Sequence, residues 1–151
     1  MTLDPIAANH PFLKGFTAEQ LEFLAANALP AHFQSDEVIF REGEMANRFY
    51  LIIKGAVVLE TYTKDRGSAL IGKLGAGEVL GCSWLFPPYY WRMDARTVEP
   101  TDAIFFYGTR LRQEAEQNHD LGYELMRRVA AVAIQSLQAA RGFPRERPLA
   151  L

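Results

Sequence analysis

Few side chains in this sequence could catalyse a reaction or bind a metal, and most of the candidates lie within residues 81–95. The single cysteine, Cys82, excludes a disulfide within the chain and a metal site made only of cysteines. The histidines His10, His32 and His119 are far apart and show no H-x-x-x-H pairing. We therefore expect no metal site and no resident cofactor.

Cys82 and its neighbour Ser83 allow two chemical interpretations each. A lone cysteine is usually a small buried residue, but a cysteine at a helix N-terminus has a lowered pKa and reacts more readily. A serine at the same place either caps the helix or offers its hydroxyl to a ligand. Both readings stay open from the sequence.

Aromatic residues are concentrated in the same stretch, and we expect them to form one cluster. The cluster would be either core and lid packing or the wall of an apolar pocket, because aromatic rings bury large areas. Pro87 and Pro88 stiffen the loop between the expected short helix and the next strand. Asp94 is expected on the surface of a strand more than in a pocket. The five residues are Trp84, Phe86, Tyr89, Tyr90 and Trp91.

Catalytic motifs are missing from the remainder of the sequence. We find no phosphate-binding loop, no G-x-S-x-G motif, no recognisable pair of carboxylates and no cluster of metal ligands. An enzyme is therefore not expected.

The middle of the chain, about residues 31–107, has the pattern of an all-β fold. Short runs rich in β-branched and aromatic residues alternate with glycine-containing turns. The spacers are too short for helical crossovers, so the strands should pair antiparallel. The predicted strands are 38–40, 49–53, 56–62, 69–74, 95–98 and 103–107.

Helices are predicted on both sides of this region. Thr17 is a candidate N-cap with Gln20 completing a capping box, and Pro30 should end that helix. Thr109 should cap a short helix over 111–117, which residues 118–120 interrupt. A longer helix should then run over 121–141, with an apolar stripe at Leu121, Leu125, Val129, Val132, Ser136 or Leu137, and Ala140.

Length and charge are those of an ordinary single globular domain. The 151 residues are expected to form one domain spanning 1–151. The net charge of -2 does not indicate a nucleic-acid or membrane partner. No signal peptide and no apolar stretch of about 20 residues is found, so we expect a cytoplasmic protein.

Four motifs, in this order, resemble the cyclic nucleotide-binding domain of catabolite activator-type (Crp/Fnr-like) regulators. The resemblance covers residues 10–141 and implies an antiparallel β-roll, or jelly roll, with an N-terminal helix and a long C-terminal helix. The motifs are Val38-Ile39-Phe40-Arg41-Glu42-Gly43-Glu44, Phe49-Tyr50-Leu51-Ile52-Ile53-Lys54-Gly55, Leu74-Gly75-Ala76-Gly77-Glu78-Val79-Leu80-Gly81 and Val98-Glu99-Pro100-Thr101-Asp102-Ala103.

In that family a phosphate cassette binds the cyclic phosphate with backbone N–H groups and an arginine, while a glutamate binds the ribose. Here the resemblance places Cys82 at the glutamate position, and the arginine position falls on Trp91 or Arg92 according to the register. Neighbouring strand residues point to opposite faces, so Arg92 would face the pocket only through a bulge. The implied ligand-binding residues are Gly81, Cys82, Ser83, Trp84, Trp91, Arg92 and Met93.

Three functions remain open at this stage. The chain could be a sensor of a cyclic nucleotide such as cyclic AMP, a dimerisation or protein-docking module that binds no nucleotide, or a sensor of another ligand. Haem would need an axial ligand from His10, His32 or Cys82. The resemblance implies a homodimer through residues 121–141, with folding back onto the roll as the alternative. It implies no direct DNA binding, because about ten residues follow Arg141.

Overall fold

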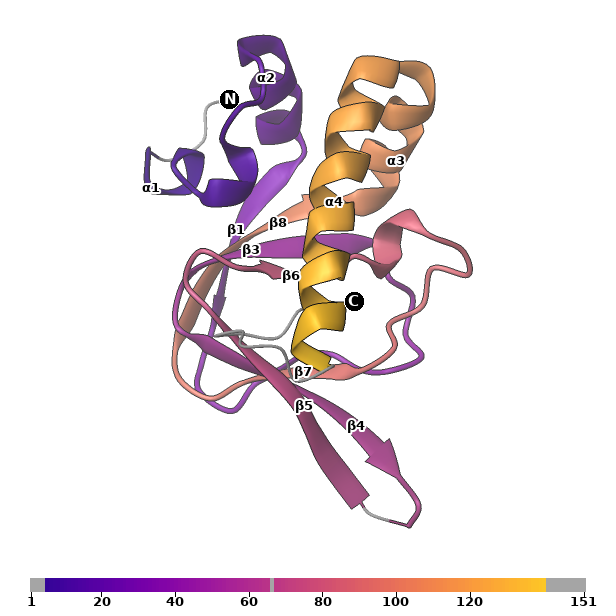
Figure 1. Ribbon diagram of the computed structural model, residues 1–151. Helices are drawn as coiled ribbons and strands as arrows, with labels where there is room; N and C mark the ends of the chain where they lie inside the picture. The colour runs from indigo at the N-terminus through magenta and orange to yellow at the C-terminus, as the bar shows by residue number, and fades with distance from the viewer. Residues whose placement is uncertain (1–4, 66, 141–151) are drawn as a thin grey trace.

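The computed structural model describes residues 5–65 and 67–140 and contains two four-stranded sheets with helices at both ends of the chain (Figure 1). The first sheet has the strand order β1–β8–β3–β6 and the second has the order β2–β7–β4–β5. All pairings between these strands are antiparallel. The predicted antiparallel β-roll is confirmed.

Six of the eight strands coincide with the runs predicted from the sequence, each within two residues at either end. The other two, β1 and β6, were not predicted. The first sheet consists of Ala28–Phe33 (β1), Arg48–Lys54 (β3), Val79–Leu80 (β6) and Thr101–Tyr107 (β8). The second consists of Val38–Phe40 (β2), Ala56–Thr63 (β4), Gly67–Gly75 (β5) and Asp94–Thr97 (β7).

The N-terminal segment forms α1 (Pro5–Ala8), the one-turn helix η1 (Pro11–Leu13) and α2 (Ala18–Ala26). The capping box of α2 is confirmed, because Thr17 and Gln20 each accept a backbone N–H from the other. The prediction that Pro30 ends this helix is wrong. The helix ends at Ala26, and Pro30 lies within β1, which pairs only with β8 and so tolerates a proline at the sheet edge.

The C-terminal helices are α3 (Gly108–Gln117) and α4 (His119–Ala140), and buried residues of α4 pack against the first sheet. The N-cap of α3 is Tyr107, so Thr109 lies inside the helix and the predicted cap is wrong. Only Asn118 separates the two helices, and Arg141 lies outside the described residues. Within 5–65 and 67–140, no helix has the length and apolar character needed to cross a membrane.

The first sheet is buried on both faces because alternate residues of its strands point to opposite sides. In β3, Phe49 and Leu51 face the helices, whereas Tyr50 and Ile52 face the second sheet. We call the two groups the helix-side cluster and the roll-side cluster. The helix-side cluster includes Phe12, Leu13, Leu24, Phe49, Leu51, Cys82, Trp84, Phe106, Leu111, Leu121, Leu125 and Val129. The roll-side cluster consists of Phe40, Ala46, Tyr50, Ile52, Val57, Leu59, Leu74, Leu80, Trp91, Met93, Ala95 and Ala103.

The apolar stripe predicted on the last helix is used largely within the chain. Leu121, Leu125 and Val129 are buried in the helix-side cluster, which is the alternative burial that the sequence left open. Val132 is half-buried, and the side chains of 136–140 lie outside the described residues. A second copy would therefore have to contact a different face of α4.

Candidate ligand-binding site

The seven candidate residues lie in the connection between β6 and β7, which contains the one-turn helix η2 (Ser83–Leu85). The N-cap of η2 is Cys82, and its side chain makes no capping hydrogen bond. Ser83 is the first residue of the turn and is buried, so its interpretation as the N-cap is wrong. The turn is short, and few backbone N–H groups are available at its start.

Gly81 and Trp91 are brought together at the beginning and end of this connection. Gly81 has φ +100°, and a Cβ atom there would lie 2.6 Å from the Trp91 ring. A side chain at position 81 is therefore excluded twice, by the left-handed backbone and by the indole. The Trp91 ring occupies the space next to the residue that opens the connection.

Trp91 points inward and is fixed there. Its side chain is 3% exposed and stacks on Phe40, with ring centroids 3.8 Å apart and planes 6° from parallel. Its backbone N–H donates to the Glu44 carbonyl at 2.9 Å, and its carbonyl accepts from the Gly43 N–H at 2.8 Å. The strand-like segment around Trp91 is thus tied to the β2–β3 connection.

Arg92 is exposed at the surface. Its positive charge lowers the pKa of the Cys82 thiol, but burial of the thiol is the larger effect and raises that pKa to about 11. The sequence left open a reactive Cys82 with a lowered pKa. The structure contradicts this, because desolvation disfavours the thiolate. Cys82 is a neutral, buried side chain at neutral pH.

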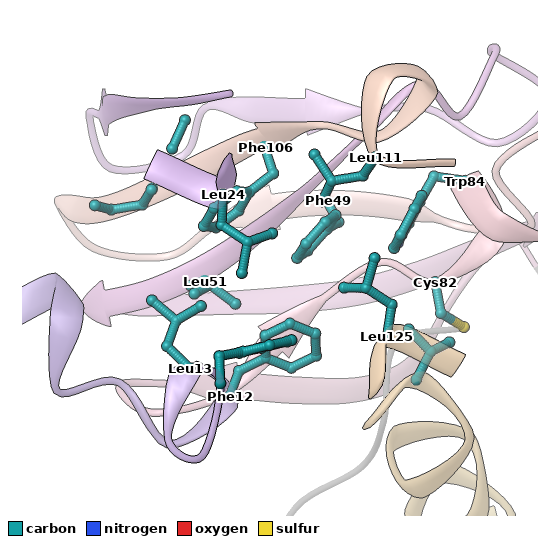
Figure 2. Packing of buried hydrophobic residues seen from close by; sticks show 14 of the residues in the cluster. Phe12, Leu13, Leu24, Phe49, Leu51, Cys82, Trp84, Phe106, Leu111 and Leu125 are labelled. Carbon is teal, nitrogen blue, oxygen red and sulfur yellow. The ribbon is translucent and has the colours of Figure 1, made fainter. Parts of the chain in front are cut away.

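Cys82 and Trp84 belong to the helix-side cluster (Figure 2). Trp84 is 0% exposed and stacks on Phe49 with centroids 4.7 Å apart. A Cβ on Gly108, the first residue of α3, would be 2.9 Å from the Cβ of Trp84, so only glycine allows this approach. The η2 turn is therefore packed directly against the start of α3.

The five aromatic residues do not form one cluster, in contrast to the prediction. Trp84 lies on the helix side and Trp91, with Met93, on the roll side. Phe86 and Tyr90 are exposed, and Tyr89 is partly exposed. The cause is the path of the connection, which passes from one face of the first sheet to the other.

Asp94 lies on β7, outside both clusters. Its carboxylate accepts the backbone N–H of Glu42 at 2.7 Å and lies 4.0 Å from the Arg41 guanidinium. It thus joins β7 to the β2–β3 connection at the surface, as the sequence suggested.

Arg112 on α3 is a residue of the site region that the sequence analysis did not identify. Its Nη1 donates to the Trp84 carbonyl, and its guanidinium lies 3.9 Å from the centre of the Tyr89 ring. An arginine on an amphipathic helix carries no sequence signal for such contacts, because a surface ion pair would produce the same pattern. Arg112 joins the η2 turn and the loop after it to α3.

The histidines do not form a metal or haem site among the described residues. Phe12 N–H donates to Nδ1 of His10, and Nε2 of His10 donates to the Glu78 carbonyl, so both ring nitrogens are used. Burial lowers the pKa of His10. His32 pairs with Asp102 at the surface, and no group of three potential metal ligands occurs within 5–65 and 67–140.

The sequence profile of the family described as "Cyclic nucleotide-binding domain" matches residues 30–118. A curated relative, a CRP-like cAMP-activated global transcriptional regulator from Mycobacterium tuberculosis, is 24% identical over 128 residues. That match covers 85% of this chain and 57% of the relative, so the chain spans little more than half the relative's length.

Two solved structures show the same architecture. A candidate cyclic nucleotide-binding protein from Geobacter metallireducens is 31% identical, has a TM-score of 0.75, and is covered to 90% by a match over 83% of this chain. The regulatory subunit of a cAMP-independent protein kinase A from Trypanosoma cruzi, bound to guanosine, is 20% identical with a TM-score of 0.66. The latter match covers 83% of this chain and 44% of that one, and it shows likeness of fold alone.

Proposed function

Because the chain belongs to the cyclic nucleotide-binding domain family, we propose that it is a non-enzymatic regulatory domain whose cassette binds cyclic AMP weakly or not at all. A ligand in the roll, or a partner on the helices, would shift the population of α3 and α4 positions. The proposal treats residues 1–151 as one sensing or docking domain in the cytoplasm.

The position of Trp91 carries this proposal. The resemblance places the phosphate-binding arginine at 91 or 92, and the inward residue of the two is Trp91. Arg92 is at the surface, and Cys82, at the position of the ribose-binding glutamate, is buried in the helix-side cluster. Neither of the two expected charges faces the roll interior.

The free energy that the missing arginine and glutamate contacts would contribute is large enough to determine the affinity for a cyclic nucleotide. A desolvated cyclic phosphate needs donors for its negative charge, and the backbone N–H groups of residues 82–84 would supply only some of them. A hydrogen bond to a charged group contributes about 1.5–3 kcal/mol. Losing the arginine and the glutamate together would weaken binding by roughly two orders of magnitude or more, at about 1.4 kcal/mol per tenfold.

Calorimetry with cyclic AMP and cyclic GMP tests the proposal. We expect no heat of binding at micromolar protein. Binding that Arg92→Ala abolishes and Trp91→Ala does not would mean that Arg92 turns into the roll when the nucleotide binds. Circular dichroism of both variants checks that they remain folded. Tight binding that survives Arg92→Ala would show that the cassette has been assigned wrongly.

A neutral ligand is the second candidate, and the uncharged side chains near the cassette favour it. Trp91 and Met93, which belong to the roll-side cluster, carry no charge. The Trypanosoma cruzi structure contains guanosine, a nucleoside without a phosphate. Guanosine in the same calorimetric series should then bind more tightly than cyclic AMP, and Trp91→Ala should strengthen it by opening space beside Phe40. Equal or weaker binding of guanosine would remove this candidate.

A homodimer through residues 121–141 remains part of the proposal, on the exposed half of α4. Ile134 is 56% exposed, and its neighbours Ala130 and Ala131 are exposed as well. We expect a dimer by light scattering at micromolar concentration and a monomer for Ile134→Glu. A wild-type chain that is entirely monomeric would remove the dimer from the proposal.

We also propose that this chain binds no duplex DNA sequence-specifically at physiological salt, since its net charge is -2. The Mycobacterium tuberculosis relative is named a transcriptional regulator, and the match covers 57% of its length. A mobility shift with one duplex but not with a scrambled one would contradict this.

A further inference from the structure

A groove of about 460 Å³ lies between the loop after η2 and the two C-terminal helices. Leu85, the last residue of η2, and Tyr89 in the loop after it line one side, and Tyr123 and Met126 line the other side on α4. Gly122 lines it where α4 touches α3, because a Cβ on this glycine would lie 2.7 Å from the Ala115 carbonyl oxygen. The large side chains of the loop and of α4 thus lie on either side of the contact between Gly122 and Ala115, where α4 touches α3.

Large apolar side chains are exposed around this groove. Tyr123 is 67% exposed and Met126 is 46% exposed, and Phe86, next to Leu85 in the loop, is 42% exposed. Tyrosine, methionine and arginine are enriched at protein interfaces, whereas lysine, glutamate, aspartate and alanine are depleted there. The lining contains two tyrosines, a methionine and Arg112 from the first group, and Ala115 and Glu116 from the second.

The positive end of the groove is held in place before any partner arrives. The Arg112 guanidinium lies over the Tyr89 ring, 3.9 Å from its centre, and donates to the Trp84 carbonyl. Immobilising a long side chain on binding costs about 0.5–1.5 kcal/mol, and here the contacts within the chain have already fixed it. Glu116 lines the groove one helical turn further along α3, so the groove has a positive end near the loop and a negative end near His119.

A second groove differs from this one in the charge of its lining. It has about 670 Å³, lies between α2 and the C-terminal helices, and is lined by the carboxylates of Glu19, Glu114, Asp120 and Glu124. No lysine or arginine from the described residues lines it. A segment with an acidic residue would be repelled there and attracted by Arg112 in the first groove.

We propose that the groove between the η2 loop and α4 docks a segment of another protein that carries an aromatic anchor and a nearby acidic residue. The anchor lies between Tyr89 and Met126, over Gly122, and the carboxylate pairs with the remaining N–H groups of Arg112. The groove joins the cassette connection to α3 and α4, so a docked partner would sense any movement between them. The docking does not depend on whether the roll binds a nucleotide.

Selection from a phage-displayed library of random dodecapeptides on the immobilised full chain, without nucleotide, tests the proposal. We expect the selected peptides to share an aromatic residue with Asp or Glu within a few positions. In fluorescence polarisation, Met126→Glu should weaken them by more than about tenfold, and so should exchange of the peptide's acidic residue for lysine. Leu70→Glu, the same kind of change at an exposed apolar residue of β5, outside both the groove and residues 121–141, is the matched control and should leave the affinity unchanged.

Three results would overturn the proposal. The first is a selection that yields no aromatic-acidic pattern, or basic peptides that fit the acidic groove instead. The second is equal binding by the wild type and Met126→Glu. The third is a dimer, seen by light scattering, that Met126→Glu dissociates and Ile134→Glu does not, which would assign the groove to a second copy of the chain.

Discussion

The helix-side and roll-side clusters each contain one tryptophan, and the two tryptophans have different tasks. Trp84 packs against Phe49 and the backbone at Gly108, and its carbonyl is held by Arg112, so it connects the η2 turn to the helices. Trp91 stacks on Phe40 and covers Gly81, so it fills the interior of the roll. Trp84 thus fixes the η2 turn relative to α3, and Trp91 fills the core between the two sheets.

The segment between β6 and β7 therefore belongs to both cores. In a ligand-binding segment, side chains are free to meet the ligand, whereas Cys82, Trp84 and Trp91 are committed to packing. Substitutions in this segment will change stability on either face of the first sheet before they change any binding. The effects below separate the two faces.

The largest expected effect is that of Trp84→Ala. Removing a fully buried indole costs about 3–5 kcal/mol of unfolding free energy, and here it also removes the contact with α3. Trp91→Ala should cost less, because it leaves the contact between the η2 turn and α3 intact. Urea denaturation followed by far-ultraviolet circular dichroism measures both. An equal or larger loss for Trp91→Ala would mean that the roll-side cluster is the more important of the two.

Gly81→Ala should destabilise the chain by about 2–3 kcal/mol, from the strained φ and the clash with the Trp91 ring. In a Trp91→Ala background the clash disappears and only the backbone strain remains. The double-mutant cycle should therefore give a coupling of about 1 kcal/mol. Simple additivity would show that the indole can move aside.

Cys82 makes the helix side sensitive to alkaline pH. Its pKa is about 11 in the folded chain against an ordinary value of 9.0, so the unfolded chain loses its proton first as the pH rises. Stability from this group is complete below pH 9 and is lost progressively up to pH 11, by about 3 kcal/mol at about 1.4 kcal/mol per pKa unit. Cys82→Ala should lack this part of the slope. An unchanged slope would mean that the thiol is accessible to water.

His10 has the smallest expected effect, at acid pH. Burial lowers its pKa below 6.5, so the unfolded chain binds the proton first as the pH falls. Stability is complete above pH 6.5 and decreases below it by at most about 1.4 kcal/mol per pH unit. Unfolding at pH 5 and pH 7 should show this decrease in the wild type and in His32→Asn, but not in His10→Asn. A decrease that persists in His10→Asn would have another origin.

The parts of the fold that follow from local pattern were predictable. Runs such as Val38–Phe40 and Ala56–Thr63 combine β-branched or aromatic residues with glycine turns, which follow the first run and lie on both sides of the second. The strand β1 was missed because Ala28–Phe33 contains Pro30 and no β-branched residue, and β6 because two residues give no period. Both strands exist through pairing with β8 and β3, which are distant in sequence.

The candidate site was located by sequence but not resolved by it. Choosing between Trp91 and Arg92 required the side that each residue faces, which depends on contacts with Phe40 and Gly81. The pKa of Cys82 depends on burial beneath α4, and the contacts of Arg112 depend on where α3 meets η2. These are tertiary relations, and no spacing within the chain encodes them.

The placement of the two indoles also gives each core its own intrinsic fluorescence probe. Trp84 and Trp91 are the only tryptophans in the sequence, and each lies in a different core, stacked on a different phenylalanine. Trp84→Phe would leave an emission spectrum from the roll interior alone, and Trp91→Phe one from the helix side alone. The fluorescence of these two variants would show whether one face of the shared sheet loosens before the other, with no attached dye.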